Sequence, residues 1–109
     1  RIGYTTFSIK KANDTDRPHR ETEWLHRQML YIRDVEATAI FKEMLDGKIQ
    51  VSIRAKMRPI NAFAEQFGGG GHLLAAGFSF DGTMAEAVAQ IIPKFGEYLR
   101  PKDAEQKPE

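Results

Sequence analysis

The stretch EQFGGGGHLLAAGFSF, from Glu65 to Phe80, decides how the second half of this chain folds. It places four consecutive glycines, Gly68–Gly71, directly before His72. A glycine costs about 0.5–1 kcal/mol relative to alanine in regular structure, so the run costs about 2–4 kcal/mol. That is a sizeable fraction of the stability of a small domain, which indicates a backbone geometry that side chains would block.

The residues on either side of the glycines predict a helix and then a strand. Apolar residues recur at helical spacing before the run, at Ile60, Phe63, Ala64 and Phe67. Gly68 is well placed to end this helix in the left-handed conformation. After His72, the segment AAGFSF (residues 75–80) predicts a return to a sheet.

A hairpin is predicted earlier in the chain, because Asp46-Gly47 lies between two runs of strand-forming residues. The run after this turn alternates strictly, which places one set of side chains in the core and the other on a polar, cationic face. The predicted core set is Ile49, Val51, Ile53, Ala55 and Met57, and the polar set is Gln50, Ser52, Arg54, Lys56 and Arg58.

The remaining segments complete the expected elements. Residues 4–9 predict a strand, and the polar residues 10–20 predict a mobile surface loop. Thr22 is a predicted N-cap for a helix that ends near Arg33, with Leu25, Met29 and Ile32 on one face. Residues 101–109 are expected to be a flexible tail.

Thr83 and Glu86 form a predicted capping box for a last helix. We expect Pro93 to kink or interrupt that helix. Its apolar stripe is Val88, Ile91, Ile92, Phe95 and Leu99. The whole pattern predicts an α/β (α+β) fold, a mixed sheet of four or five strands with about three helices packed on it.

Composition bounds the classes of function. The chain has 109 residues, of which 41% are hydrophobic and 28% charged, which suits one compact soluble domain. Its formal charge of +1 implies that any affinity for nucleic acid comes from a local patch. Without cysteine it forms no disulfide or thiolate metal site, which fits a cytoplasmic location, and no apolar run reaches the about 18 residues of a membrane span. Because the chain begins at Arg1, we expect it to be a piece of a longer protein.

Three interpretations of Gly68–Gly71 compete. A flexible turn would need only one or two glycines. A nucleotide P-loop requires lysine and a hydroxyl residue where His72-Leu73 stands, and a dinucleotide fingerprint would follow a strand rather than a helix. The favoured interpretation is an anion nest, in which bare N–H groups converge on a phosphate or a sugar edge and the imidazole of His72 points the same way.

The alternating strand supplies positive charge for such an anion. Between Gly47 and Phe80 there are four basic residues and one acidic residue, Glu65. The guanidinium of Arg54 suits bidentate phosphate binding, and Ser52 adds a hydroxyl on the same face. Lys56 and Arg58 fit a solvated strand face as well as they fit a binding role.

A catalytic centre is not apparent in the sequence. Two-metal hydrolysis of a phosphate ester needs clustered Asp and His ligands. The candidates are Asp14, Asp16 and His19 in the polar segment, and Glu23 with His26 on the first predicted helix. Both sets are too small, so we expect no metal and no catalytic residue in this chain.

The motif FGGGGHLLAAGF, preceded by VSIRAKMRPINAFAEQ, resembles the C-terminal substrate-binding domain of the DHH (Asp-His-His) phosphoesterases, the DHH-associated domain. The resemblance is strongest from about Val35 to Phe80 and extends weakly to Leu99. It is greatest to the bacterial nano-RNase, phosphoadenosine-phosphate phosphatase and exopolyphosphatase-related branch.

The resemblance implies a binding role for seven residues: Ser52, Arg54, Gly68, Gly69, Gly70, Gly71 and His72. Many members of the family carry a second serine where this chain has Ala55. The resemblance also implies a manganese-binding catalytic domain before Arg1, a short oligonucleotide or nucleotide phosphate as substrate, and no membrane; it leaves a homodimer open. The alternative is a non-catalytic nucleic-acid-binding or oligomerisation module like the C-terminal domain of alanyl-tRNA synthetases.

Overall fold

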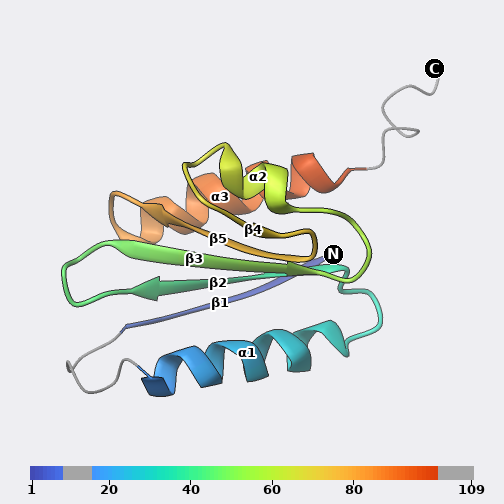
Figure 1. The fold of residues 1–109 in the computed structure, drawn as a ribbon, viewed down its shortest axis with the longest axis horizontal. Helices are drawn as coiled ribbons and strands as arrows, with labels where there is room; N and C mark the ends of the chain where they lie inside the picture. Colours follow the sequence, from blue (N-terminus) through green and yellow to red (C-terminus); the bar gives the residue numbers. More distant parts are fainter. Residues whose placement is uncertain (9–15, 101–109) are drawn as a thin grey trace.

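The computed structural model of the chain describes residues 1–8 and 16–100, with no side-chain description for residues 16–21. Figure 1 shows one sheet with helix α1 on one side and helices α2 and α3 on the other. In chain order the elements are β1 (Ile2–Ser8), α1 (Asp16–Leu30), β2 (Ala37–Glu43), β3 (Ile49–Ala55), α2 (Asn61–Glu65), β4 (Gly70–His72), β5 (Ala75–Phe80) and α3 (Met84–Leu99).

The sheet has five strands in the order β1-β2-β3-β5-β4. β1 runs parallel to β2, from the pair Ile2 and Ala37 to the pair Ser8 and Glu43, and the other neighbours are antiparallel. A parallel pair needs a long crossover connection, and α1 lies within it. The predicted mixed sheet of four or five strands with about three helices is therefore confirmed.

The predicted hairpin joins β2 to β3. Gly47 has a φ of 88°, in the left-handed region that glycine adopts without strain. The Met44 N–H donates to the Lys48 carbonyl at 2.8 Å, and the Lys48 N–H donates to Asp46 Oδ1 at 3.0 Å. These bonds close the turn and fix the antiparallel register of β2 and β3.

The alternation of β3 is confirmed up to Ala55 and is wrong for Met57. The apolar residues from Ile49 to Ala55 are buried, but β3 ends at Ala55 and Met57 is 89% exposed. The chain leaves the sheet there because Pro59 follows and α2 begins at Asn61.

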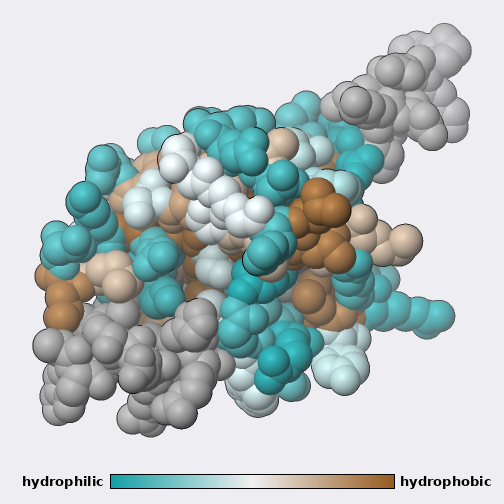
Figure 2. Space-filling model, viewed as in Figure 1, coloured by the Kyte–Doolittle hydropathy of each residue, from teal (hydrophilic) through white to brown (hydrophobic). Residues whose placement is uncertain are grey.

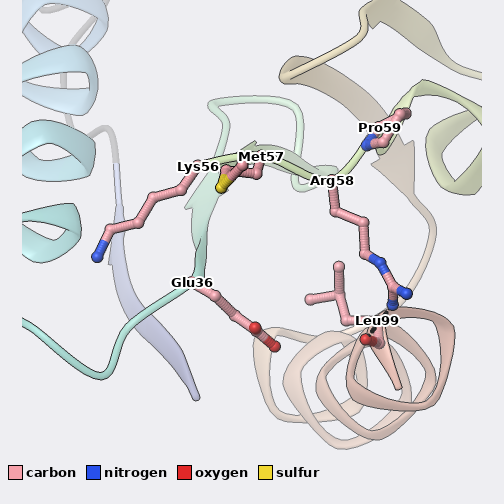
Figure 3. Close-up of a pocket in the computed structure, with 6 residues that line it drawn as sticks. All are labelled: Glu36, Lys56, Met57, Arg58, Pro59 and Leu99. Carbon is pink, nitrogen blue, oxygen red and sulfur yellow. Dashed lines mark hydrogen bonds between the residues drawn. The ribbon is translucent and has the colours of Figure 1, made fainter. Parts of the chain in front are cut away.

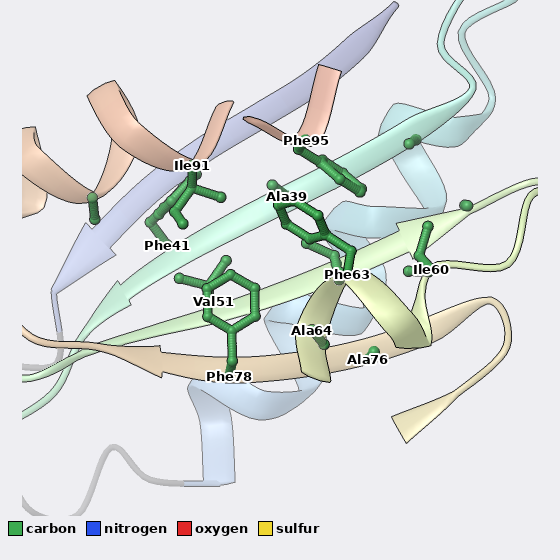
Figure 4. Close-up of a cluster of buried hydrophobic side chains, with 14 of the residues drawn as sticks. Ala39, Phe41, Val51, Ile60, Phe63, Ala64, Ala76, Phe78, Ile91 and Phe95 are labelled. Atoms are coloured by element: carbon green, nitrogen blue, oxygen red, sulfur yellow. The ribbon is translucent and has the colours of Figure 1, made fainter. Parts of the chain in front are cut away.

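The core lies between the sheet and the pair α2 and α3. Figure 4 shows Phe63 of α2 and Phe95 of α3 over the apolar side chains of the sheet, including Phe78. The ring centroids of Phe63 and Phe95 are 5.0 Å apart, and those of Phe63 and Phe78 are 6.1 Å apart. The opposite face of the sheet, toward α1, carries mostly polar side chains together with the buried Ile40 of β2.

Helix α3 begins with the predicted capping box. Thr83 Oγ1 accepts from the Glu86 N–H at 3.1 Å, and the Thr83 N–H donates to Glu86 Oε1 at 2.8 Å. The expected interruption at Pro93 is wrong, because α3 is continuous from Met84 to Leu99. Pro93 and Ala89 are both exposed, so water can bind the Ala89 carbonyl that receives no N–H from the proline.

Helix α1 begins earlier than its pattern predicts. The loop predicted for residues 10–20 is wrong from Asp16 onward, and Thr22 is a buried residue inside the helix rather than its N-cap. The first turn tolerates Pro18 because N–H groups there have no helical partner. The helix also ends at Leu30, before the predicted Arg33.

The predicted tail, residues 101–109, and the expectations for residues 9–15 lie outside the described residues. No described helix is both long enough and apolar enough to span a bilayer.

Candidate functional site

A hollow of about 280 Å³ lies on the α1 face of the sheet, beside the part that α1 covers. α1 packs on β1, β2 and β3, so the β4 and β5 side of this face stays open. Small residues of β4 and β5, among them Gly70, Ala75 and Gly77, line the hollow together with Arg54. Backbone is accessible there because these residues lack large side chains.

Five of the seven predicted site residues line this hollow: Ser52, Arg54, Gly70, Gly71 and His72. Gly68 and Gly69 do not line it. The strands β3 and β4, distant in sequence, are brought together because both flank β5 in the sheet. Thr22, Glu23, Lys42 and Gln50 also line the hollow, and the sequence did not predict any of them as binding residues.

The glycine run is not a nest of four free amides. The Gly68 N–H donates to the Glu65 carbonyl at 3.1 Å, and the Gly69 N–H donates to the Ala64 carbonyl at 3.0 Å. Gly70–His72 then form β4, which pairs with β5. The nest expected at Gly68–Gly71 is therefore wrong for its first two amides, which close the end of α2. Gly68 has a φ of 83°, which confirms the predicted left-handed termination.

Close packing on β5 explains two of the other three glycines. A Cβ on Gly69 would lie 2.1 Å from the Gly77 carbonyl oxygen, and one on Gly71 would lie 2.6 Å from that of Ala75. Gly70 differs, because a Cβ there would meet no atom of the described residues within 4 Å, and its φ is not positive. The described residues give no reason for a glycine at position 70, where the missing side chain keeps the hollow open.

The Arg54 guanidinium is held at the rim of the hollow. Its Nη1 donates to the Ile53 carbonyl at 3.0 Å and to Ser52 Oγ at 3.3 Å. Its Nη2 forms an ion pair with Glu23 of α1. The side chain remains 20% exposed, so an anion can reach the guanidinium by replacing the Glu23 carboxylate.

The buried His26 of α1 contacts the hydroxyl group of Ser52 and holds it in position. His26 Nε2 lies 3.0 Å from Ser52 Oγ, and its Nδ1 lies 2.6 Å from Thr38 Oγ1. Burial lowers the pKa of His26 to about 3, with the charges of Arg54 and then Lys42 acting in the same direction. The imidazole is therefore neutral near pH 7, and both of its nitrogens are engaged by hydroxyl groups.

Lys42 adds a second cation to the hollow. It is only 8% exposed, in a strand whose other residues from Ala37 to Phe41 are fully buried. Burial lowers the pKa of Lys42, and the Glu23 carboxylate acts against this effect. Among the described lining residues, Lys42 and Arg54 face the single carboxylate of Glu23, so this part of the lining favours an anion. In the sequence, Lys42 is marked only by its position directly after the largely apolar run from Ala37 to Phe41.

A larger hollow, of about 470 Å³, lies at the end of β3, and the cations that line it bond to backbone carbonyls of the chain. It is lined by Glu36, Lys56, Met57, Arg58, Pro59 and Leu99 (Figure 3). The Arg58 guanidinium donates to the Leu99 carbonyl, so it binds the C-terminal end of α3. Lys56 extends toward α1, and its Nζ donates to the Ile32 carbonyl at 3.2 Å.

Among the described residues, no group of three or more His, Asp or Glu side chains could hold a metal ion. His26 and Glu23, two of the candidates from the sequence, are engaged by Ser52, Thr38 and Arg54. Asp14 and the side chains of Asp16 and His19 lie outside the described residues.

The sequence model of the DHHA1 domain matches residues 24–100, so the chain belongs to the DHHA1 domain family. Over 69 residues, 63% of this chain, it is 41% identical to a Streptococcus mutans protein named "Probable bifunctional oligoribonuclease and PAP phosphatase NrnA". It is also similar in structure to an exopolyphosphatase-related protein from Bacteroides fragilis, with a TM-score of 0.67, 29% sequence identity and 87% of this chain covered. The matched region makes up 21% of the first relative and 29% of the second.

Proposed function

We propose that this chain is the substrate-binding domain of a DHH phosphoesterase that hydrolyses short oligonucleotides or nucleoside phosphates. The family membership and the name of the Streptococcus mutans relative support this proposal. The observation that carries it is the open hollow, where Arg54, Gly70 and His72 lie around accessible backbone. We place the protein in the cytoplasm, and we propose no membrane partner.

Phosphate binding follows from the contacts of Arg54. A phosphate oxygen replaces the Glu23 carboxylate at Nη2, while the bonds from Nη1 to Ile53 and Ser52 keep the guanidinium in place. Hydrogen bonds to a charged group contribute about 1.5–3 kcal/mol each. His72 is exposed on the opposite wall and donates a further hydrogen bond to the ligand.

The proposed hydrolysis belongs to a separate DHH domain that holds Mn²⁺. The described residues of this chain do not fit a manganese site, because no cluster of three ligands exists among them.

Leu73 and Leu74, next to His72, are 61% and 40% exposed. Figure 2 shows an apolar (brown) group at the right of the molecule, where Figure 1 places the turn between β4 and β5. We propose that this turn faces the catalytic domain.

The test is a calorimetric titration of the chain with the 5′-phosphorylated dinucleotide pApA, carried out at two salt concentrations. Arg54→Ala removes a charged hydrogen-bond donor and is expected to weaken binding by about 10- to 150-fold. His72→Ala is expected to weaken it as well, and affinity should fall as salt rises.

Lys94→Ala is the matched control. It removes one positive charge from α3, on the other side of the sheet, and should leave the dissociation constant unchanged. If neither Arg54→Ala nor His72→Ala weakens binding, or if Lys94→Ala weakens it equally, the proposed site is wrong.

A further inference from the structure

We infer a second nucleotide subsite beside the hollow, formed by Arg27 and Tyr31 from α1 and the turn after it, and by Lys56 after β3. This inference rests on the proposed function and extends it from one phosphorylated nucleotide to at least two. Arg27, Leu30, Tyr31 and Lys56 line a separate depression of about 310 Å³.

The two sites are aligned because α1 and β3 run in the same direction, as Figure 1 shows. Along α1, Glu23 lines the first hollow, and Arg27 and Tyr31 follow at steps of about 6 Å. Along β3, Lys56 lies one strand repeat, about 6.6 Å, beyond Arg54. Along β3 a cation at the first hollow, Arg54, is thus followed by a second cation, Lys56, while α1 passes from the Glu23 carboxylate to Arg27.

The chemistry of the second depression fits a base and a phosphate. Tyr31 is 83% exposed, so its ring is accessible as a stacking surface. Lys56 extends toward α1 and away from Glu36 (Figure 3), and its bond to the Ile32 carbonyl occupies one of its three ammonium hydrogens. Arg27 forms no ion pair with any described residue, so both cations are available to a phosphate.

Among the described residues, the exposed Tyr31 side chain forms no aromatic contact and no hydrogen bond, so the described contacts give it no structural role. Ring stacking tolerates any base, whereas the cations recognise the backbone phosphate. The subsite therefore predicts selection for chain length rather than for base sequence. A dinucleotide would place its first phosphate at Arg54 and its second nucleotide over Tyr31.

The experiment compares pA with pApA on the wild-type chain and on Tyr31→Ala and Tyr31→Phe. The wild type is expected to bind pApA more tightly than pA. Loss of base stacking in Tyr31→Ala should weaken pApA binding by about 5- to 150-fold and leave pA binding unchanged. Tyr31→Phe keeps the ring and should bind as the wild type does.

Trp24→Ala is the matched control, because Trp24 is an exposed aromatic residue of α1 that lines neither hollow. If Tyr31→Ala binds pApA as tightly as the wild type, or if Trp24→Ala loses the same affinity, the subsite is overturned. Binding of pA that depends on Arg54 would still support the proposed function in that case. Absence of binding to either ligand would overturn both.

Discussion

Substitution of Gly70 by alanine tests whether the glycine run binds a ligand or serves only the fold. In Gly70→Ala the new methyl group meets no atom of the described part of the chain within 4 Å, and the φ at this position is not positive. The methyl group instead projects into the open hollow that Gly70 lines. The substitution is therefore expected to obstruct a ligand while leaving the fold intact.

The substitution is expected to stabilise the fold but to weaken ligand binding. A compatible Gly→Ala change stabilises a protein by about 0.4–1 kcal/mol, because the unfolded chain loses conformational entropy. An extra methyl group forced into a packed contact costs about 1–3 kcal/mol, which corresponds to an about 5- to 150-fold weaker dissociation constant. Gly70→Ala should therefore raise the free energy of unfolding and weaken pApA binding.

Urea denaturation and calorimetric titration measure the two effects on the same sample. Gly96→Ala is the matched control, because its methyl group would lie on α3 at an ordinary 3.7 Å from Ile2. It should stabilise the chain and leave binding unchanged. Gly69→Ala should instead destabilise the fold by about 1–3 kcal/mol or more, since its Cβ would lie 2.1 Å from the Gly77 carbonyl.

Unchanged pApA affinity in Gly70→Ala would refute this reasoning, because the ligand would then not approach β4 closely. A loss of stability in Gly70→Ala would refute its structural half, because the space beside Gly70 would then not be open.

Three further predictions concern the side chains around the hollow and the start of α3. Glu23→Gln should tighten phosphate binding, since the carboxylate that competes for Arg54 is removed; calorimetry that shows weaker binding would contradict this. The folded pKa of His26, about 3, lies below its ordinary 6.5, so the unfolded chain binds the extra proton. Stability from neutral His26 is thus fully present above pH 6.5 and is lost toward pH 3, with a slope approaching about 1.4 kcal/mol per pH unit. Urea titrations between about pH 6 and pH 5 should show this slope in the wild type and a flatter one in His26→Gln. Thr83→Ala should cost about 0.5–2 kcal/mol of stability without changing pApA affinity, and an unaltered urea midpoint would contradict the capping role.

Local patterns in the sequence predicted most of the fold. The Asp46-Gly47 turn, the alternation of β3 up to Ala55 and the capping box at Thr83 each depend on residues close together in the chain. The start of α1 was missed because its first turn is polar and contains Pro18, a composition shared by loops and helix N-termini.

The site was predicted only in part because its geometry depends on contacts between distant segments. Arg54 and Ser52 follow from strand alternation, but their partners Glu23 and His26 come from α1, across the sheet face. The glycine run predicted a backbone geometry that side chains would block, which holds at Gly69 and Gly71, but not that the Gly68 and Gly69 amides bond to α2. Whether the glycine backbone approaches β5 or a ligand depends on the strand order, which the sequence pattern does not specify.

The most direct test of the binding hollow is a titration with pApA in which NMR records the chemical shift of each backbone amide. Ligand in the hollow predicts the largest shifts at β4, at residues 75–77 of β5 and around Arg54, with α3 unaffected. Shifts concentrated instead around Arg58 and Leu99, at the larger hollow beyond the end of β3, would contradict the assignment of the site.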